Sequence, residues 1–291
     1  MDLIPLDFVE ELLINIFAIC NFCTRDFQPY QQISGVFGSC ASRLQTGIYS
    51  KNLNISNGAF ESVCYLNVNF QGGIEVNPIS KKYQVKKNVN FNAPRNRIPD
   101  VDEGLKRQLD DFLLEPGMLR LTLHTSFRCN NSWIKLFSSW KNLQSINVTM
   151  HCTVDESLYQ FLLELANQEQ LVNLTFFSSG YNTREINLLC RLWQQKQFKW
   201  LYVAKWNREL NDRIMTLVSE NRKEYAGKRV KWWTKVGLPD ESFKNLGRYD
   251  SHTVRFGNDF TTIDYAYIYG DDKQTDAEIL RYAHSTDVRF L

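Results

Sequence analysis

Two stretches, Leu143-Gln-Ser-Ile-Asn-Val148 and Leu171-Val-Asn-Leu-Thr-Phe176, share a pattern with apolar residues at positions one, four and six. The same pattern begins at Met118 and at Phe198, and a weaker copy begins at Gly227. Successive starts lie 25, 28, 27 and 29 residues apart, which leaves room for one helix between short strands. Such a period is typical of stacked α/β repeats. The sequence therefore predicts an α/β solenoid of helix–strand units whose strands form a parallel sheet.

The composition is that of an ordinary globular protein, with 43 % apolar and 23 % charged residues in a chain of 291. A formal net charge of +2 argues against a dedicated nucleic-acid-binding protein, which usually carries a basic excess. The first seven residues carry two acids and no base, unlike a secretory signal, and no apolar run is long enough to span a bilayer. We therefore expect a cytoplasmic or nuclear protein without nucleic-acid or membrane partners.

The cysteines and histidines do not suggest a reactive or metal centre. The seven cysteines are odd in number and scattered, which predicts reduced thiols rather than a disulfide framework. Cys20 and Cys23 have the spacing of half a zinc site, but no second ligand pair follows. The four histidines are dispersed, and no phosphate-binding glycine loop follows a strand. We expect neither catalysis nor a metal or other cofactor.

Changes in the apolar pattern predict three segments. Spacings of three and four indicate a helix over 6–19, and a second helix, interrupted by glycines, is expected around 33–44. From about 47 to 93 the period changes to two, as in strands, and Pro94 to Pro99 marks a boundary. The segments are a helical one at 1–45, an antiparallel β region at 46–98 and the helix–strand units at 99–291.

The β region carries strands near 53–55, 62–70 and 83–91, with turns at Asn57-Gly58 and Gly72-Gly73. A basic cluster lies on its last strand and the following loop. Its members are Lys81, Lys82, Lys86, Lys87, Arg95 and Arg97. One interpretation is a charged edge strand protected against aggregation, and the other is a phosphate-binding site.

Helix starts between the strands carry a polar side chain followed by Glu at the third position, as in a capping box. These pairs are Asp100 with Glu103, Thr153 with Glu156, Asn182 with Glu185, and Thr275 with Glu278. Near the end, 253–256 and 262–269 alternate across Gly257-Asn258, which predicts a hairpin. A helix at 277–284 and a strand at 288–291 complete a cap that covers the last unit.

The outward positions of the predicted strands form a candidate binding face. Side chains alternate along a strand, so the residues between the core positions point away from the core. The early units place small polar groups there, whereas the later ones place aromatic and basic residues, the types that contribute most to binding energy at interfaces. The candidate target-binding residues are Phe177, Trp200, Tyr202, Arg229 and Trp233. The alternative is that the C-terminal hairpin or the β region covers this face.

The stretch from Ile4 to Ile16 resembles the opening of an F-box. That motif begins with Leu-Pro, here Ile4-Pro5, and continues as a helix with paired apolar residues. The second half is divergent, because 33–44 is interrupted by glycines and contains no tryptophan. The whole chain is similar to a nematode-expanded group of F-box-related proteins, in which a β region and leucine-rich-repeat-like units follow the helix.

The resemblance implies that the helix docks on the Skp adaptor of a cullin–RING ubiquitin ligase. The implied adaptor contacts are Pro5, Phe8, Val9, Leu12, Leu13 and Ile16. It also implies a leucine-rich-repeat-like solenoid that binds a protein target, and thus a non-catalytic substrate-recognition adaptor of a Skp–cullin–F-box type ligase. The alternative is a stand-alone protein-interaction module with a decayed F-box. An exposed apolar stripe on the helix favours docking, and a buried one favours the stand-alone module.

Overall fold

The computed structural model describes residues 5–19, 28–68, 75–78, 80–92, 99–124, 131–149, 154–178, 181–237, 242–267 and 275–291. The chain forms two compact units, Met1–Thr122 and Leu123–Leu291, and each is described by itself. The division falls inside strand β4 (Met118–His124). Helices alternate with strands, and both units contain parallel strand pairs, so the predicted mixed α/β class is confirmed.

The first unit opens with α1 (Leu6–Ile19), which confirms the predicted helix, followed by α2 (Gln28–Gln31) and α3 (Val36–Gly47). Val9 and Leu13 of α1 are buried in a cluster with Cys40, Ala41, Leu44, Ile48 and Val85. Gly38 of α3 is required by close packing, because a Cβ atom there would lie 2.0 Å from the carbonyl oxygen of Ile33. Gly38 therefore permits the contact of this helix with the preceding turn.

The sheet of the first unit has the strand order β2-β1-β3-β4. Strands β1 (Tyr49–Ser56) and β2 (Ala59–Asn67) form an antiparallel hairpin. Asn57 and Gly58 turn it with φ of 55° and 80°, as predicted. However, β1 runs parallel to β3 (Gln84–Asn92), so the prediction of an antiparallel region is wrong for this pair. A period of two determines which face is buried but not strand direction, and the long connection from β2 to β3 allows a crossover. Gly72 and Gly73 lie outside the described residues.

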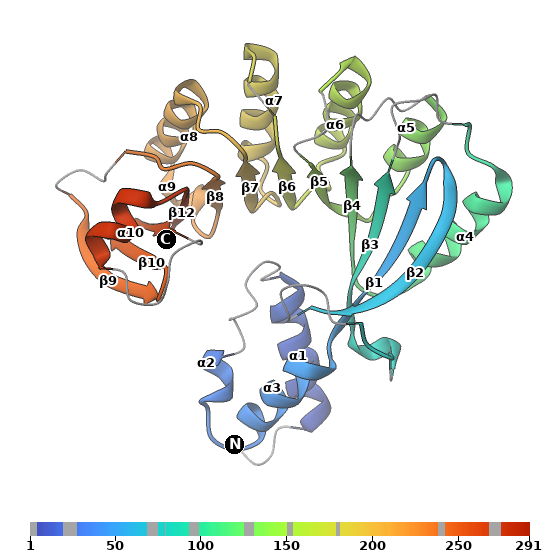
Figure 1. Ribbon diagram of the computed structural model, residues 1–291, viewed down its shortest axis with the longest axis horizontal. Coiled ribbons are helices and arrows are strands. Elements are labelled where there is room, and N and C mark those ends of the chain that lie inside the picture. The colour runs from blue at the N-terminus through green and yellow to red at the C-terminus, as the bar shows by residue number, and fades with distance from the viewer. Residues whose placement is uncertain are drawn as a thin grey trace. The chain divides into compact units, whose positions relative to one another are not determined.

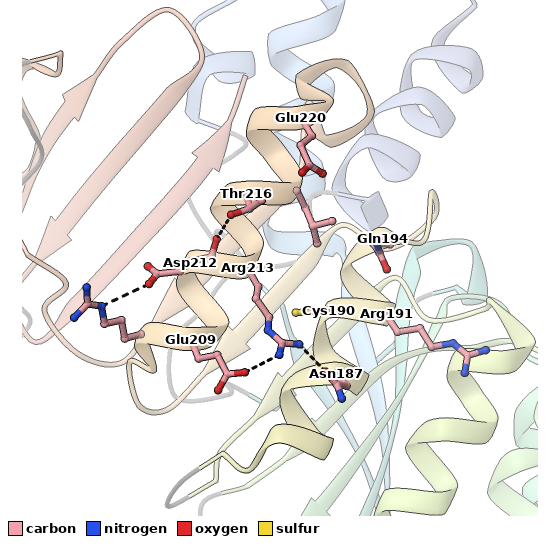
Figure 2. Close-up of a pocket in the computed structure, with 11 residues that line it drawn as sticks. Asn187, Cys190, Arg191, Gln194, Glu209, Asp212, Arg213, Thr216 and Glu220 are labelled. Carbon is pink, nitrogen blue, oxygen red and sulfur yellow. Dashed lines mark hydrogen bonds and ion pairs between the residues drawn. The ribbon is translucent and has the colours of Figure 1, made fainter.

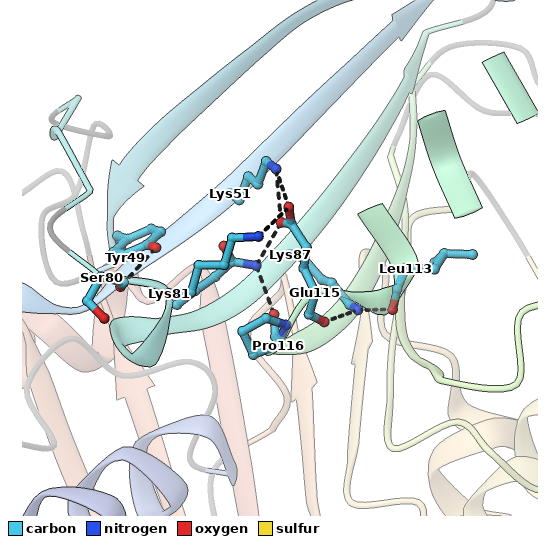
Figure 3. A network of polar contacts seen from close by, with 9 residues as sticks. Tyr49, Lys51, Ser80, Lys81, Lys87, Leu113, Glu115 and Pro116 are labelled. Atoms are coloured by element: carbon cyan, nitrogen blue, oxygen red, sulfur yellow. Dashed lines mark hydrogen bonds and ion pairs between the residues drawn. The ribbon is translucent and has the colours of Figure 1, made fainter. Parts of the chain in front are cut away.

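The basic cluster holds elements of this unit together (Figure 3). Strand β3 lies between β1 and β4, so the edge-strand interpretation is wrong. The Nζ atom of Lys87 donates to the carbonyls of Leu113 and Glu115, both at 2.5 Å, at the end of α4 (Glu103–Leu114). The Glu115 carboxylate accepts from Nζ of Lys51 at 2.7 and 2.9 Å. Burial alone would raise the pKa of Glu115, but the hydrogen bond and charge of Lys51, together with Gln84 and Lys81, outweigh it and lower this pKa. Arg95 and Arg97 lie outside the described residues.

The second unit continues the alternation with α5 (Asn131–Ser138), β5 (Leu143–Val148), α6 (Glu156–Gln168), β6 (Asn173–Phe176), α7 (Thr183–Gln194), β7 (Trp200–Val203), α8 (Arg208–Glu220), α9 (Arg222–Tyr225) and β8 (Arg229–Trp232). Strands β5, β6, β7 and β8 pair in parallel and in sequence order. The sequence pattern therefore located these strands and their direction correctly. In Figure 1, helices α5 to α8 follow one another along one side of these strands.

The core lies between the strands and these helices. Alternate strand residues are 0–2 % exposed: Leu121, Leu123, Ile146, Val148, Leu174, Phe176, Leu201, Val203, Val230 and Trp232. These are the positions that the six-residue pattern assigns to the core. The helices contribute apolar residues at helical spacing, such as Leu158, Leu162 and Leu165 of α6, which are 0–1 % exposed. The opposite strand positions therefore form the outward face.

Polar side chains at the strand entries cap the helix of the preceding unit. The amide of Gln170 donates to the carbonyl of Trp140 at 3.0 Å, beyond the end of α5. The amide of Gln195 donates to Ala166 of α6 at 2.5 Å. The Nζ atom of Lys228, which is 1 % exposed, donates to Trp193 and Gln195 at the end of α7, at 2.5 and 2.8 Å. Because the last carbonyls of a helix lack partners within it, each unit completes its predecessor.

The chain ends in antiparallel strands with the order β8-β12-β11-β10-β9. They are β9 (Lys244–Asp250), β10 (Thr253–Gly257), β11 (Thr261–Ala266) and β12 (Ser285–Phe290), with α10 (Asp276–Tyr282) before β12. The predicted hairpin is confirmed as β10–β11, whereas β9 was not predicted. The capping boxes at Asn182 and Thr275 are confirmed. Asp102 caps α4 in place of Asp100, and Asp155 caps α6. Thr153 lies outside the described residues.

Candidate interaction surfaces

Helix α1 presents two apolar stripes with different environments. Val9 and Leu13 are 2 % and 0 % exposed and pack in the core of the first unit. Phe8 and Leu12 are 56 % and 38 % exposed, and Pro5 is exposed before the first turn. Positions 5, 8 and 12 share one face of a helix, because their spacings are three and four. Ile16 belongs to α1, but its side chain lies outside those described. The implied adaptor contacts therefore divide into an exposed and a buried set.

A buried carboxylate anchors the inner side of α1. Glu10 is 3 % exposed, and its carboxylate pairs with Nζ of Lys82 at 2.7 Å and with the guanidinium of Arg43 on α3. A buried charge is tolerated only with such partners. These pairs and the packing of Val9 and Leu13 fix the rotation of α1, so Phe8 and Leu12 are held outward. Ile33 and Val36, which precede or begin α3, add exposed apolar surface to the same unit, at 43 % and 44 %.

The predicted target-binding aromatics meet in one row on the outward face of the second unit. We call Phe177, Trp200, Tyr202 and Trp233 the aromatic row. The rings of Trp200 and Tyr202 lie 5.9 Å apart, and those of Tyr202 and Trp233 lie 6.0 Å apart, both with an interplanar angle of 18°. Phe177 meets Tyr202 edge-on at 5.2 Å. Near-parallel and edge-on pairs at these distances are favourable aromatic arrangements.

Accessibility varies along this row. Trp233 is 39 % exposed, Tyr202 and Phe177 are half-buried, and Trp200 is only 8 % exposed. Outward residues of the earlier strands are buried as well, with Ser145 at 1 % and Asn173 at 4 %. Within the aromatic row, Trp233, Tyr202 and Phe177 are therefore the accessible members.

The hydroxyl group of Tyr202 is buried, and it has no hydrogen-bond partner among the described residues. Burial raises the pKa of Tyr202, and the nearby charge of Asp287 raises it further. Tyr202 therefore stays protonated and keeps a donor available over the physiological range. An unpaired buried hydroxyl lowers stability, and a ligand that supplies an acceptor would recover this loss of free energy.

Arg229, the remaining predicted target residue, is part of a charged group that the sequence did not reveal. Its Nε donates to the carboxylate of Asp287 on β12 at 2.6 Å. Its guanidinium carbon also lies 5.4 Å from the ring centre of Trp200, within range of a cation–π contact. On β10 and β11, Arg255 pairs with Asp264 in the same way, at 2.6 and 2.8 Å. Only the antiparallel register of β8, β12, β11 and β10 brings these residues together, so sequence spacing carried no signal for them.

A groove of about 870 Å³ lies between α7 and α8 (Figure 2). Its arginines are mostly satisfied within the groove: Arg213 pairs with Glu209 at 2.7 Å and donates to Asn187 at 2.6 Å. Burial raises the pKa of Cys190 in its wall, although Arg213 partly opposes this, so the thiol is a poor nucleophile. The groove has balanced charge, with three arginines and three acids in its lining, and shows no nucleophile–base pair.

In the described part of the chain, His, Cys, Asp and Glu side chains do not gather in groups of three or more that could hold a metal ion. Among the described helices, none combines the length and the apolar character needed to cross a lipid bilayer. Comparison of the chain with protein-family models, with curated proteins and with solved structures finds no match.

Proposed function

We propose that this chain is a non-catalytic substrate-recognition adaptor of a Skp–cullin–F-box type ubiquitin ligase. In this proposal α1 docks on a Skp-type adaptor, and the outward face of the second unit binds a protein target. The observation that carries the proposal is the exposed stripe of Pro5, Phe8 and Leu12 on a helix that buries Val9 and Leu13 in its own unit. A soluble helix gains nothing by exposing such a stripe unless another surface covers it.

The burial of Val9 and Leu13 refines which residues take part. An amphipathic helix that enters a partner's groove uses anchors spaced three, four or seven residues apart. Phe8 and Leu12 fulfil that requirement, with Pro5 before them. Val9, Leu13 and Glu10 instead hold α1 on its own unit. The adaptor would therefore contact Pro5, Phe8 and Leu12. The three residues that hold α1 on its own unit would orient this contact surface.

Target recognition is assigned to the aromatic row together with Arg229. The helix–strand units would form a leucine-rich-repeat-like solenoid, and the outward positions of successive strands would line up as one binding surface. Half-buried aromatic rings give large contact area with little loss of rotamer freedom. Trp233 and Tyr202 are the accessible anchors, whereas Trp200 supports Tyr202 from below the surface.

A stand-alone interaction module with a decayed F-box is the second candidate. The observation in its favour is that Val9 and Leu13, two of the implied adaptor contacts, are used in the core of the chain itself. The divergent second half of the motif also favours the stand-alone module, because Ile33 and Val36 are exposed and this stretch of the sequence contains no tryptophan. In this candidate only the outward face of the second unit has a partner.

Titration of the purified chain with a purified Skp-type adaptor separates the two candidates. We expect wild type to bind with a Kd of about 1 μM or tighter, and Leu12→Asp or Phe8→Asp to weaken binding by about tenfold or more. Leu114→Asp is the matched control, because Leu114 is 86 % exposed at the end of α4 and should leave binding unchanged. Absence of binding by a folded wild-type chain would discard docking in favour of the stand-alone module.

A further inference from the structure

Five charged residues face one another on four strands of the second unit, and we call them the Arg–Asp lattice. Arg229 of β8 stands opposite Arg289 of β12, and Asp287 of β12 stands opposite Asp264 of β11. Arg255 of β10 stands opposite Asp264 on the other side. Residues directly opposite one another share one face of a sheet, so all five side chains lie on the same face.

The aspartates of the lattice hold the arginines in fixed orientations. Asp287 accepts from Nε and Nη2 of Arg229, and Asp264 accepts from the same two atoms of Arg255. Asp264 also lies 3.4 Å from Nη2 of Arg289. The aspartate side chains are 7–8 % exposed, whereas the arginine side chains are 21–31 % exposed. Buried carboxylates thus position guanidinium groups whose outer parts remain accessible.

Favourable cross-strand ion pairing explains only part of this arrangement, the pairs of Arg255 with Asp264 and of Lys231 with Asp287. Arg229 stands directly opposite Arg289, and Asp287 directly opposite Asp264, although like charges in opposed positions are unfavourable. Lys231 adds a further cation opposite Asp287, so four cations meet two carboxylates on this face. The surplus of positive charge is complementary to an anionic partner.

Two buried donors on this face are unpaired among the described residues. They are the hydroxyl of Tyr202 and the Nε–H of Arg289. Both groups lost their water on folding without gaining an acceptor from the described protein, which is unfavourable. An acceptor brought by a ligand would recover that loss, and a carboxylate is the acceptor that best matches a guanidinium.

The aromatic row borders the lattice on the same face. Trp200 stands opposite Arg229, and Tyr202 stands opposite Lys231, whose Nζ lies 5.3 Å from the Tyr202 ring centre. Tyr249 extends the aromatic surface at the far side, with the Arg255 guanidinium 4.1 Å from its ring centre. Neighbouring strands lie about 4.8 Å apart, so the cationic and aromatic strips can contact a single segment at once.

We propose that this face binds an acidic, extended segment of a partner protein, with its carboxylates over the Arg–Asp lattice and its apolar side chains over the aromatic row. The proposal rests on the proposed function, because it names the chemistry of the target that the outward face receives. Arg289 and Tyr202 contribute donors to the bound carboxylates. Arg229 and Arg255 contribute charge whose position the aspartates fix.

A peptide fits this face better than a nucleic acid does. Asp264 and Asp287 lie in the floor of the lattice and would repel a backbone that carries one negative charge on every nucleotide. A peptide can place isolated carboxylates over the arginines and neutral side chains elsewhere. The two near-parallel contacts of Tyr202, with Trp200 and Trp233, also leave its ring little room to stack on a base.

Fluorescence anisotropy with a labelled random copolymer of glutamate and tyrosine tests the proposal. We expect the full chain to bind this probe at about 0.15 M salt, more tightly than labelled polyglutamate or a labelled thymidine oligonucleotide. Arg289→Gln should weaken binding by about tenfold, and Tyr202→Phe by about threefold. Arg289 suits substitution because Asp264 keeps Arg255 as its partner. Arg208→Gln is the matched control, since Arg208 is 83 % exposed on α8, away from this face.

Three results would overturn the proposal: no binding of the copolymer by wild type, tighter binding of the oligonucleotide, or equal losses in Arg289→Gln and Arg208→Gln. Thermal unfolding of each variant, together with Arg289→Lys, separates lost contacts from lost folding, because lysine keeps the charge at this position. The Leu12→Asp variant should bind the copolymer like wild type. A chain that binds the Skp-type adaptor but not the copolymer therefore refutes this inference alone, and the reverse result refutes the docking proposal alone.

Discussion

Gly117 links α4 to β4, and replacing it with alanine should destabilise the chain strongly. Its φ is +99°, a conformation that side chains with a Cβ atom rarely adopt. A Cβ atom there would lie 3.0 Å from the nitrogen of Lys86, 3.0 Å from the carbonyl carbon of Val85 and 3.1 Å from the oxygen of Gln84. All three are backbone atoms around the start of β3, which cannot rotate away as a side chain can.

The expected loss in free energy of unfolding has two parts, and substitutions at two other glycines allow them to be measured separately. The positive φ costs about 1 kcal/mol, and crowding against the β3 backbone adds about 2 kcal/mol, so Gly117→Ala should lose about 3 kcal/mol. Gly227 has φ of +80°, but a Cβ atom there would meet nothing within 4 Å, so Gly227→Ala should lose only about 1 kcal/mol. Gly47 has neither problem and ends α3, so Gly47→Ala should be neutral or gain up to about 1 kcal/mol.

Urea unfolding followed by circular dichroism measures all three variants against wild type. The order of free energies of unfolding should be Gly47→Ala, then Gly227→Ala, then Gly117→Ala, from the most to the least stable. If Gly117→Ala were no less stable than Gly227→Ala, the crowding argument would be refuted. The packing of the α4–β4 connection against β3 would then be looser than the distances imply.

Three further perturbations test the polar contacts. Glu115→Gln should lower the free energy of unfolding by about 1–3 kcal/mol at pH 7. Because the pKa of Glu115 is lowered in the folded state, this deficit should vanish as acid protonates the wild-type carboxylate. A deficit that persists at low pH would contradict the pairing with Lys51. Tyr202→Phe should raise the free energy of unfolding by about 1 kcal/mol by removing the unpaired buried hydroxyl, whereas a clear loss would reveal a hidden partner. Burial, followed by the charge of Lys199, lowers the pKa of Lys228 to about 8. Because the folded state then holds fewer protons than the unfolded state, wild type should gain about 2 kcal/mol over Lys228→Met between pH 8 and pH 10, and parallel pH profiles would argue against this shift.

The sequence predicted the central strands well because their pattern reflects a strong physical constraint. Residues such as Ile146 and Val148 must be apolar, since helices cover them, and the intervening helix forces a parallel return. The prediction of helix starts was less reliable where two acidic residues lie close together in the sequence. Asp100 and Asp102 could each cap α4, and the structure shows the Asp102 carboxylate accepting from the backbone N–H groups of Gly104 and Leu105.

The candidate surfaces were predictable only in part, for a related reason. Periodicity places Phe8, Val9, Leu12 and Leu13 on an apolar helix, but it cannot say which stripe its own unit buries. Strand β9 escaped prediction because Lys244–Asp250 has few β-forming residues and becomes a strand through pairing with β10. The Arg–Asp lattice was not predicted either, because its members meet only through the antiparallel return of β12 to β8.

The glutamine and lysine caps at the strand entries affect how the chain is made. As the ribosome extends the polypeptide, α5 emerges well before Gln170 can reach the Trp140 carbonyl that follows it, and α6 emerges well before Gln195 can reach the Ala166 carbonyl. Each helix terminus therefore frays until roughly one more unit has been synthesised, and assembly advances in one direction along the chain. Lys228 completes α7 last, so a nascent chain stalled before that residue would leave the carbonyls at the end of α7 without this donor.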